Sequence, residues 1–255
     1  MNNFLAIYKR ELRLYFTSPI AYVLVFIFLV LAGYFFYSGL TFYSMISLQS
    51  MRNPYMARLN LVDMIITPLF SNLSVVLLLM LPMLTMRLFA EEKKSGTYEL
   101  LFSYPVRDVE VLLGKYFAAM TVFAVMLALT GFYHLLLAGL GLQVPRVVLS
   151  GYLGLLLLGG AFIALGIFIS SLTENQIVAA VASFGVLLLF WIIGWSAASV
   201  GPGPAAFFEY ISLVKHLMSF TKGLIDTADL AYYLLFTFFF LFLTLRSLES
   251  NRWRG

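Results

Sequence analysis

The sequence predicts an all-α integral membrane protein with six transmembrane helices, and three observations support this class. Of its 255 residues, 62% are hydrophobic and only 11% are charged, whereas soluble domains carry about 25% charged residues. Uncharged runs long enough to cross a bilayer recur along the chain. Basic residues gather at the ends of these runs, where they are typical of membrane orientation and not of nucleic-acid binding.

Residues 2–17 are expected to form an amphipathic helix that lies in the headgroup layer. Its apolar face carries Phe4, Leu5, Tyr8, Leu12 and Tyr15. Its opposite face carries Ala6 and the three basic residues Lys9, Arg10 and Arg13. Ser18-Pro19 then breaks the helix and turns the chain into the bilayer.

The sequence predicts a single transmembrane domain, residues 1–255, in which six segments are long enough to form spanning helices. The expected spans are residues 20–40, 65–88, 109–141, 147–172, 176–199 and 229–247. Pro82 predicts a kink in the second span because it removes one backbone hydrogen bond. Gly166 and Ser170 lie four residues apart in the fourth span, a spacing that allows close helix approach.

Residues 203–226 are predicted to lie along, or dip into, the outer surface. They follow the helix-breaking sequence Gly201-Pro202-Gly203-Pro204. Apolar residues recur at helical spacing: Phe207, Ile211, Val214, Leu217, Phe220 and Leu224. Polar residues lie opposite them: Ser212, Lys215, Ser219 and Lys222.

The distribution of basic residues predicts the orientation of the chain. With a cytoplasmic amino end, eleven lysines and arginines fall inside and five fall outside. By the positive-inside rule, both termini are cytoplasmic. The charged segment at residues 89–108 then becomes the largest cytoplasmic loop.

The sequence lacks the patterns of an enzyme. There is no phosphate-binding loop and no paired-histidine zinc motif. With no cysteine, thiolate metal sites and cysteine nucleophiles are excluded. His134 and His216 are far apart and have no carboxylate at ligand spacing, so we expect no catalytic, cofactor or metal site. Charges are absent from the middle of every span, which argues against an ion-driven transporter.

The loop at residues 89–108 has the pattern of a short rigid helix between two spans. Glu91 to Lys94 are expected to keep the chain in water. Gly96-Thr97 offers an N-cap and Glu99 suits the first turn of a helix. Its apolar side would consist of Leu100, Leu101 and Phe102, and Pro105 would end it. A plain solvated loop is the alternative interpretation.

The motif Glu92-Lys93-Lys94-x-Gly96-Thr97-x-Glu99-Leu100-Leu101-x-x-x-Pro105 resembles the coupling-helix signature of ABC-2 type transporter permeases. The opening Lys9-Arg10-Glu11-Leu12 and the run Gly166 to Ile177 resemble the same family. Within it, the likeness is to gliding-motility-type (GldF-like) permeases. The resemblance covers nearly the whole chain.

This resemblance implies an ABC-2 (type V exporter-like) permease fold with an amino-terminal amphipathic helix and a cytoplasmic coupling helix. It implies a multi-pass subunit of the bacterial inner membrane that pairs with a second, identical or different permease. Separate ABC ATPase subunits would bind ATP and Mg and carry all the ATPase activity. The residues that would couple to them are Glu91, Glu92, Gly96, Thr97, Glu99, Leu100, Leu101, Phe102 and Pro105. Cargo would pass between the two permeases, past spans one, two and five.

Two alternatives remain open on the sequence. The same assembly could do mechanical work on an envelope machine of gliding or secretion without moving cargo. The chain could also be a passive channel or lipid scramblase that needs no ATPase. The sequence does not name a cargo or a direction.

Overall fold

The computed structural model describes residues 3–52, 62–97, 106–139, 141, 144–196 and 202–252. These residues are almost entirely helical. In chain order the elements are α1 (Asn3–Thr17), α2 (Pro19–Arg52), the π-helix η2 (Val62–Ile66), α3 (Thr67–Thr85), α4 (Arg87–Lys94), α6 (Asp108–Gly139), α7 (Pro145–Leu172), α8 (Gln176–Ser196), α9 (Pro202–Ile211), α10 (Leu213–Thr221) and α11 (Thr227–Arg252). In the described part, six segments are long and apolar enough to cross a membrane, so the predicted fold class is confirmed.

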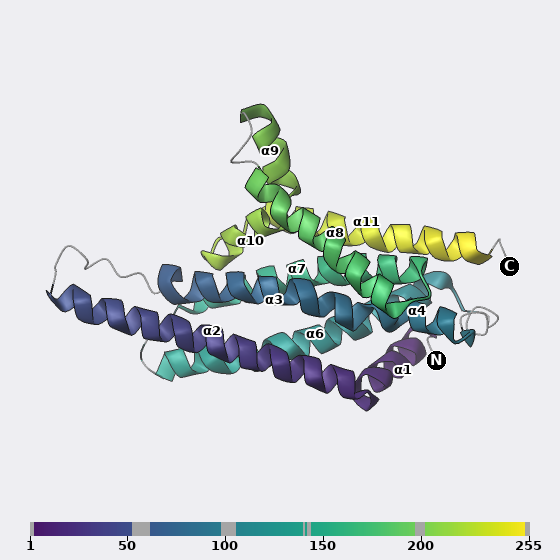
Figure 1. The fold of residues 1–255 in the computed structure, drawn as a ribbon, viewed down its shortest axis with the longest axis horizontal. Helices are drawn as coiled ribbons and strands as arrows, with labels where there is room; N and C mark the ends of the chain where they lie inside the picture. Colours follow the sequence, from purple (N-terminus) through teal and green to yellow (C-terminus); the bar gives the residue numbers. More distant parts are fainter. Residues whose placement is uncertain are drawn as a thin grey trace.

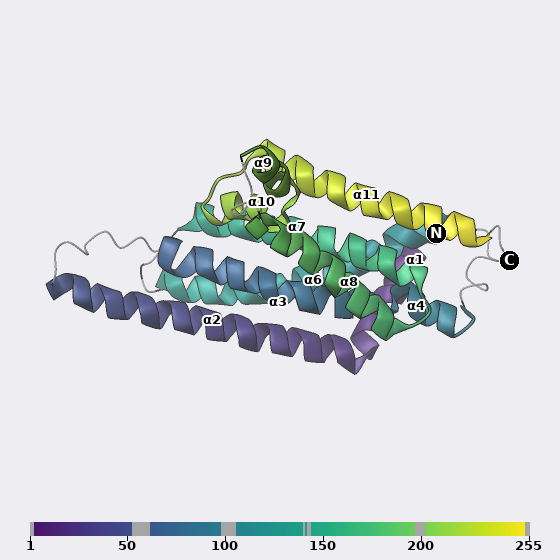
Figure 2. The ribbon, with the colours of Figure 1, turned by 45° about the horizontal axis from the view of Figure 1, so that its top comes forward.

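The long helices run side by side along the longest axis of the molecule (Figures 1 and 2). Both chain termini, α1 and α4 lie at one end of this bundle, which we call the terminal end (Figure 1). The start of α3, the end of α2 and the α9–α10 pair lie toward the other end (Figure 1). The terminal end is therefore where the charged segment meets the bundle.

Helix α7 is the centre of the bundle. It contacts α3, α4, α6, α8, α10 and α11, and it is the most buried of the six spans. Its glycines allow this close packing: a Cβ atom on Gly159 would lie 2.1 Å from Cε1 of the buried Phe123 on α6. Small residues let membrane helices approach closely enough to gain dispersion energy, which is the main attraction between helices in lipid.

This packing predicts that Gly159→Ala destabilises the protein. Because the added methyl group must displace Phe123 in a filled core, we expect the free energy of unfolding to fall by about 1–3 kcal/mol. Gly185→Ala is the matched control, since Gly185 is also helical but has open space around its would-be Cβ. Thermal unfolding of both variants in detergent checks this, and equal melting temperatures would contradict it.

The helices α2, α8 and α11 form the periphery of the bundle. They are the least buried of the spans and expose large apolar side chains. Helix α3 contacts both α2 and α8, so the first, second and fifth spans are neighbours in space. Faces of this kind are stable only against lipid or another protein.

Several boundaries differ from the sequence expectations. Helix α2 continues to Arg52, well past residue 40, because the polar residues after the span do not break a helix. Residues 89–94, expected in the loop, belong to helix α4. Pro82 lies inside helix α3, and the second span is interrupted after it, at Met86 between α3 and α4.

The stretch predicted to lie along the outer surface forms two helices, α9 and α10, joined at Ser212. The Ser212 hydroxyl caps α10 by accepting a hydrogen bond from the Lys215 amide. No carboxylate was expected at metal-ligand spacing from His216, and its partner is 13 positions away: His216 Nδ1 lies 2.6 Å from Oδ1 of Asp229 at the start of α11. This pairing fastens α10 to α11, a contact between two helices that the spacing in the sequence did not indicate.

Candidate functional site

The candidate site is the junction at the terminal end, where the short helix α4 meets α1, α6 and α7. Helix α1 lies along α6, with Ile7 seated where Gly114 leaves room: a Cβ on Gly114 would lie 2.7 Å from Cγ2 of Ile7. The buried side chains of α1 are Ile7, Glu11 and Tyr15. Part of the predicted apolar face therefore turns toward the bundle, but Leu5 is exposed and the acidic Glu11 is buried.

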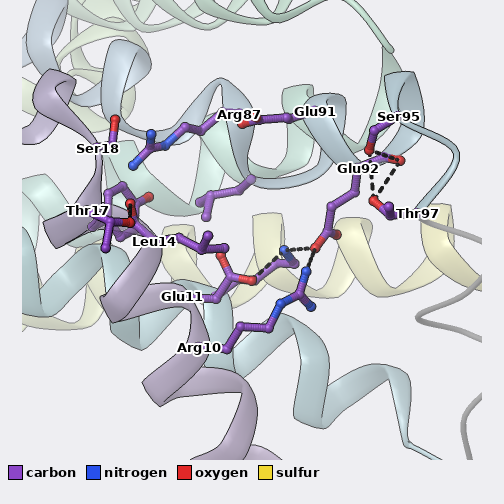
Figure 3. A pocket seen from close by; sticks show the side chains of 13 residues that line it. Arg10, Glu11, Leu14, Thr17, Ser18, Arg87, Glu91, Glu92, Ser95 and Thr97 are labelled. Carbon is purple, nitrogen blue, oxygen red and sulfur yellow. Dashed lines mark hydrogen bonds and ion pairs between the residues drawn. The ribbon is translucent and has the colours of Figure 1, made fainter.

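What we call the buried charge cluster consists of three buried side chains, Glu11, Glu92 and Lys115, with the exposed Arg10 at its rim, and it links three of these helices (Figure 3). Lys115 Nζ on α6 lies 3.0 Å from Glu11 Oε1 on α1 and 2.9 Å from Glu92 Oε1 on α4. Arg10 Nη2 lies 3.2 Å from the same oxygen of Glu92. The Lys115 side chain is only 1% exposed, so its charge depends on these two carboxylates.

The cluster is electrically balanced, with two cations and two carboxylates. Burying such charges costs several kcal/mol per ion, and each is stable only while its partners remain. Glu92 was expected to stay in water, yet its side chain is 10% exposed because Lys115 and Arg10 draw it into the bundle. The cluster therefore holds α4 in one position relative to α1 and α6.

A second contact, the Ser170 bridge, fastens α4 to α7. The Ser170 hydroxyl donates to the Met86 carbonyl (2.8 Å) and accepts from the amides of Phe89 and Ala90 (3.1 Å each). A side chain inserted among the backbone hydrogen bonds is a known cause of helix breaks. It accounts for the interruption of the second span at Met86.

Further contacts reinforce this junction. Lys93 Nζ donates to the Ser171 carbonyl at 2.6 Å. The Tyr15 hydroxyl donates to the Leu84 carbonyl at 2.9 Å, and Arg87 lies 4.7 Å from the centre of the Tyr15 ring. Burial raises the pKa of the Tyr15 hydroxyl, so it keeps the proton that it donates. Helix α4 is thus held by polar contacts on two sides.

The structure separates the predicted coupling residues into three groups. Glu92 belongs to the buried charge cluster, and Glu91 is exposed one position before it. Gly96, with a φ of +69°, ends α4, and helical structure begins again at Thr97; both residues are exposed. The remaining positions lie outside the described residues: Glu99, Leu100, Leu101, Phe102 and Pro105. All three basic residues of α1 are exposed, and of these Arg10 pairs with Glu92 of the cluster.

Sequence reasoning missed Glu11, Lys115 and Ser170 as members of this site. Lys115 was counted only as an orientation signal, yet it is fully buried. One signal was present: Glu11 is the only acid in residues 2–17, and a single acid in a basic amphipathic helix needs a cation. The spacing of Gly166 and Ser170 predicted a close helix approach, but it did not indicate that α4 would be the partner.

This arrangement is suited to transmitting force between helices. Within the described ranges, no three His, Asp or Glu side chains are placed to hold a metal ion. The charged groups of the junction are paired mainly with one another. The fold and the junction define a class: a multi-pass helical membrane protein whose polar site joins one short surface helix to the transmembrane bundle.

Residues 5–233 match the family model described as "ABC-2 family transporter protein", and the chain belongs to this family. Its members are membrane components of transporters that lack an ATPase site of their own and associate with an ABC ATPase. No curated protein sequence matches the chain.

Proposed function

We propose that this chain is the permease subunit of an ATP-driven transporter and that α4 carries mechanical input from a separate ATPase into the bundle. The observation that supports this proposal is the double attachment of α4. The buried charge cluster ties it to α1 and α6, and the Ser170 bridge ties it to α7. A partner that pushes on the segment after Gly96 would therefore move three helices together.

The proposed cycle needs no chemistry in this chain. ATP and Mg would be bound by the partner ATPase, and closure of the ATPase would displace the loop that follows α4. Packed helices move as rigid bodies and do not deform continuously. Both termini, α4 and that loop would lie on the cytoplasmic side of the bacterial inner membrane.

A second permease subunit is part of the proposal. The neighbouring spans α2, α3 and α8 offer a surface for it, since α2 and α8 expose large apolar side chains on either side of α3. Cargo would pass between the two subunits along these spans. The identity of the second subunit and of the cargo stays open.

Gly96 provides the test, with Gly141 as a matched control. Both glycines have positive φ, +69° and +79°, and neither has an atom within 4 Å of a would-be Cβ. Alanine at either position adds about 1–2 kcal/mol of local backbone strain without a clash. Because Gly96 sets the direction in which the chain leaves α4, we expect Gly96→Ala to lower permease-stimulated ATPase activity severalfold. Gly141→Ala should leave it unchanged.

The measurement is ATP hydrolysis by the assembled complex in nanodiscs, with the ATPase alone as the baseline. Equal coupling in both variants would count against α4 as the input. If no ABC ATPase co-purifies with the wild-type chain, the passive channel or scramblase is favoured instead. If the ATPase couples but reconstituted vesicles accumulate no cargo, the mechanical function of gliding-type assemblies is favoured.

A further inference from the structure

A cavity of about 370 Å³ opens between α1 and α4 beside the buried charge cluster. One part of its lining is the cluster itself, where the cations are already paired with carboxylates. The other part lies where α1 turns into α2, and there the Arg87 side chain points toward Ser18, away from the ion pairs (Figure 3). This second part is what we call the headgroup pocket: Thr17, Ser18, Arg87 and Glu91.

The headgroup pocket contains an unneutralised cation with a hydroxyl donor beside it. Among the described residues, Arg87 forms no ion pair; its guanidinium lies over the Tyr15 ring and also interacts with the Tyr15 hydroxyl. The Ser18 hydroxyl accepts a hydrogen bond from the Ile20 amide at 3.4 Å and donates to no described group. The Thr17 hydroxyl, by contrast, already donates to the Arg13 carbonyl. Two sets of free donors therefore face one space, which suits a phosphate group.

An acid completes the pocket. Glu91 is exposed, lines the same cavity and forms no ion pair within the described ranges. It lies four residues after Arg87, so the two side chains share one face of α4 at a spacing of about 5–6 Å between Cβ atoms. Arg87 and Glu91 do not pair with each other. They are therefore complementary to a ligand that carries a phosphate for the arginine and an ammonium group for the glutamate.

An apolar surface adjoins the pocket along α2 and α3. Tyr15 and Arg87, which line the cavity, also lie beside Ile20, Ala21, Leu24, Met83 and Leu84. Of these, Ile20 and Met83 are exposed. A free phosphate or amino acid would leave these two apolar side chains uncovered, whereas an acyl chain would cover them.

We propose that this site binds a phosphatidylethanolamine-type lipid from the adjacent leaflet. Its phosphate lies against Arg87 and Ser18, its ammonium group against Glu91, and one acyl chain along the exposed side chains of Ile20 and Met83. The bound lipid contacts α1, α2 and α4 at once. It therefore joins the junction helices to the first span.

The test compares lipid binding by native mass spectrometry of the purified full chain. The probes share dioleoyl chains and differ in headgroup: phosphatidylethanolamine, phosphatidylglycerol, phosphatidylcholine and phosphate-free diacylglycerol. We expect the wild-type chain to prefer phosphatidylethanolamine. Arg87→Gln should weaken its binding roughly tenfold, as expected for loss of a charged hydrogen bond. Glu91→Gln should abolish the preference over phosphatidylglycerol.

Arg13→Gln is the matched control, because Arg13 is an exposed arginine of α1 outside the cavity. Its binding should equal that of the wild-type chain, and melting temperatures show whether each variant is folded. Equal losses in the Arg13 and Arg87 variants would overturn the site. So would equal retention of diacylglycerol, displacement of lipid by millimolar inorganic phosphate, or an unchanged headgroup preference in the Glu91 variant.

Discussion

Replacing Lys115 with methionine is expected to lower the free energy of unfolding by about 3–5 kcal/mol. Methionine preserves the length and packing of the side chain, so the loss is electrostatic. It leaves Glu11 and Glu92 facing each other in a site where their side chains are 5% and 10% exposed. Two buried carboxylates without a shared cation repel each other and cannot regain their hydration. Thermal or denaturant unfolding in detergent measures the change.

Two further variants decide whether charge is the cause. Lys94→Met removes an exposed lysine from the same region and should change the unfolding free energy by less than about 0.5 kcal/mol. Adding Glu11→Gln and Glu92→Gln to the Lys115→Met chain should restore most of the lost stability, because no uncompensated buried charge remains. A triple variant as unstable as Lys115→Met would show that the cluster does not act through its charges.

Replacing Ser170 with alanine is expected to cost about 2–3 kcal/mol, the second largest effect, since one hydroxyl satisfies three backbone groups. The Met86 carbonyl loses a donor, and the amides of Phe89 and Ala90 lose their acceptor. Each buried polar group left without a partner costs about 1–3 kcal/mol, reduced where the backbone relaxes. Because Ser170 is fully buried, water does not reach the site to replace it.

Amide hydrogen exchange provides a local measurement of this effect. In the Ser170→Ala chain, exchange should accelerate at Phe89 and Ala90 more than in the rest of the bundle. Ser44→Ala is the control, because the exposed Ser44 hydroxyl bonds only the Thr41 carbonyl of its own helix. Unaltered protection of the two α4 amides would mean that the Ser170 bridge does not hold the break in the second span.

The sequence was sufficient for those features that a bilayer imposes locally. A spanning helix must satisfy its own backbone hydrogen bonds and match the thickness of the hydrocarbon, so each span leaves a signal about 20 residues long. The six spans and the break at Ser18-Pro19 follow from that signal. Family membership was also readable, since its motifs are contiguous in the chain.

The apolar composition that the bilayer requires also conceals which residues of different helices contact one another. A helix that is apolar on every side has no periodic face, so the sequence did not show that α7 would be central or that α2, α8 and α11 would be peripheral. Helix ends also differed from the predictions. Helix α2 continues to Arg52 because no helix-breaking residue ends it earlier. Helix α3 ends just before Met86, where a side chain from another helix sets the boundary.

By itself, then, the sequence determined the class of protein, the number of its spans and the family to which it belongs, because these depend on composition and on neighbouring residues. Tertiary structure alone decided the junction at the terminal end. Glu11 and Lys115 are 104 positions apart, and Phe89 and Ser170 are 81 apart. Partners so distant in the chain carry no local pattern, and they meet only when packing brings α1, α4, α6 and α7 together.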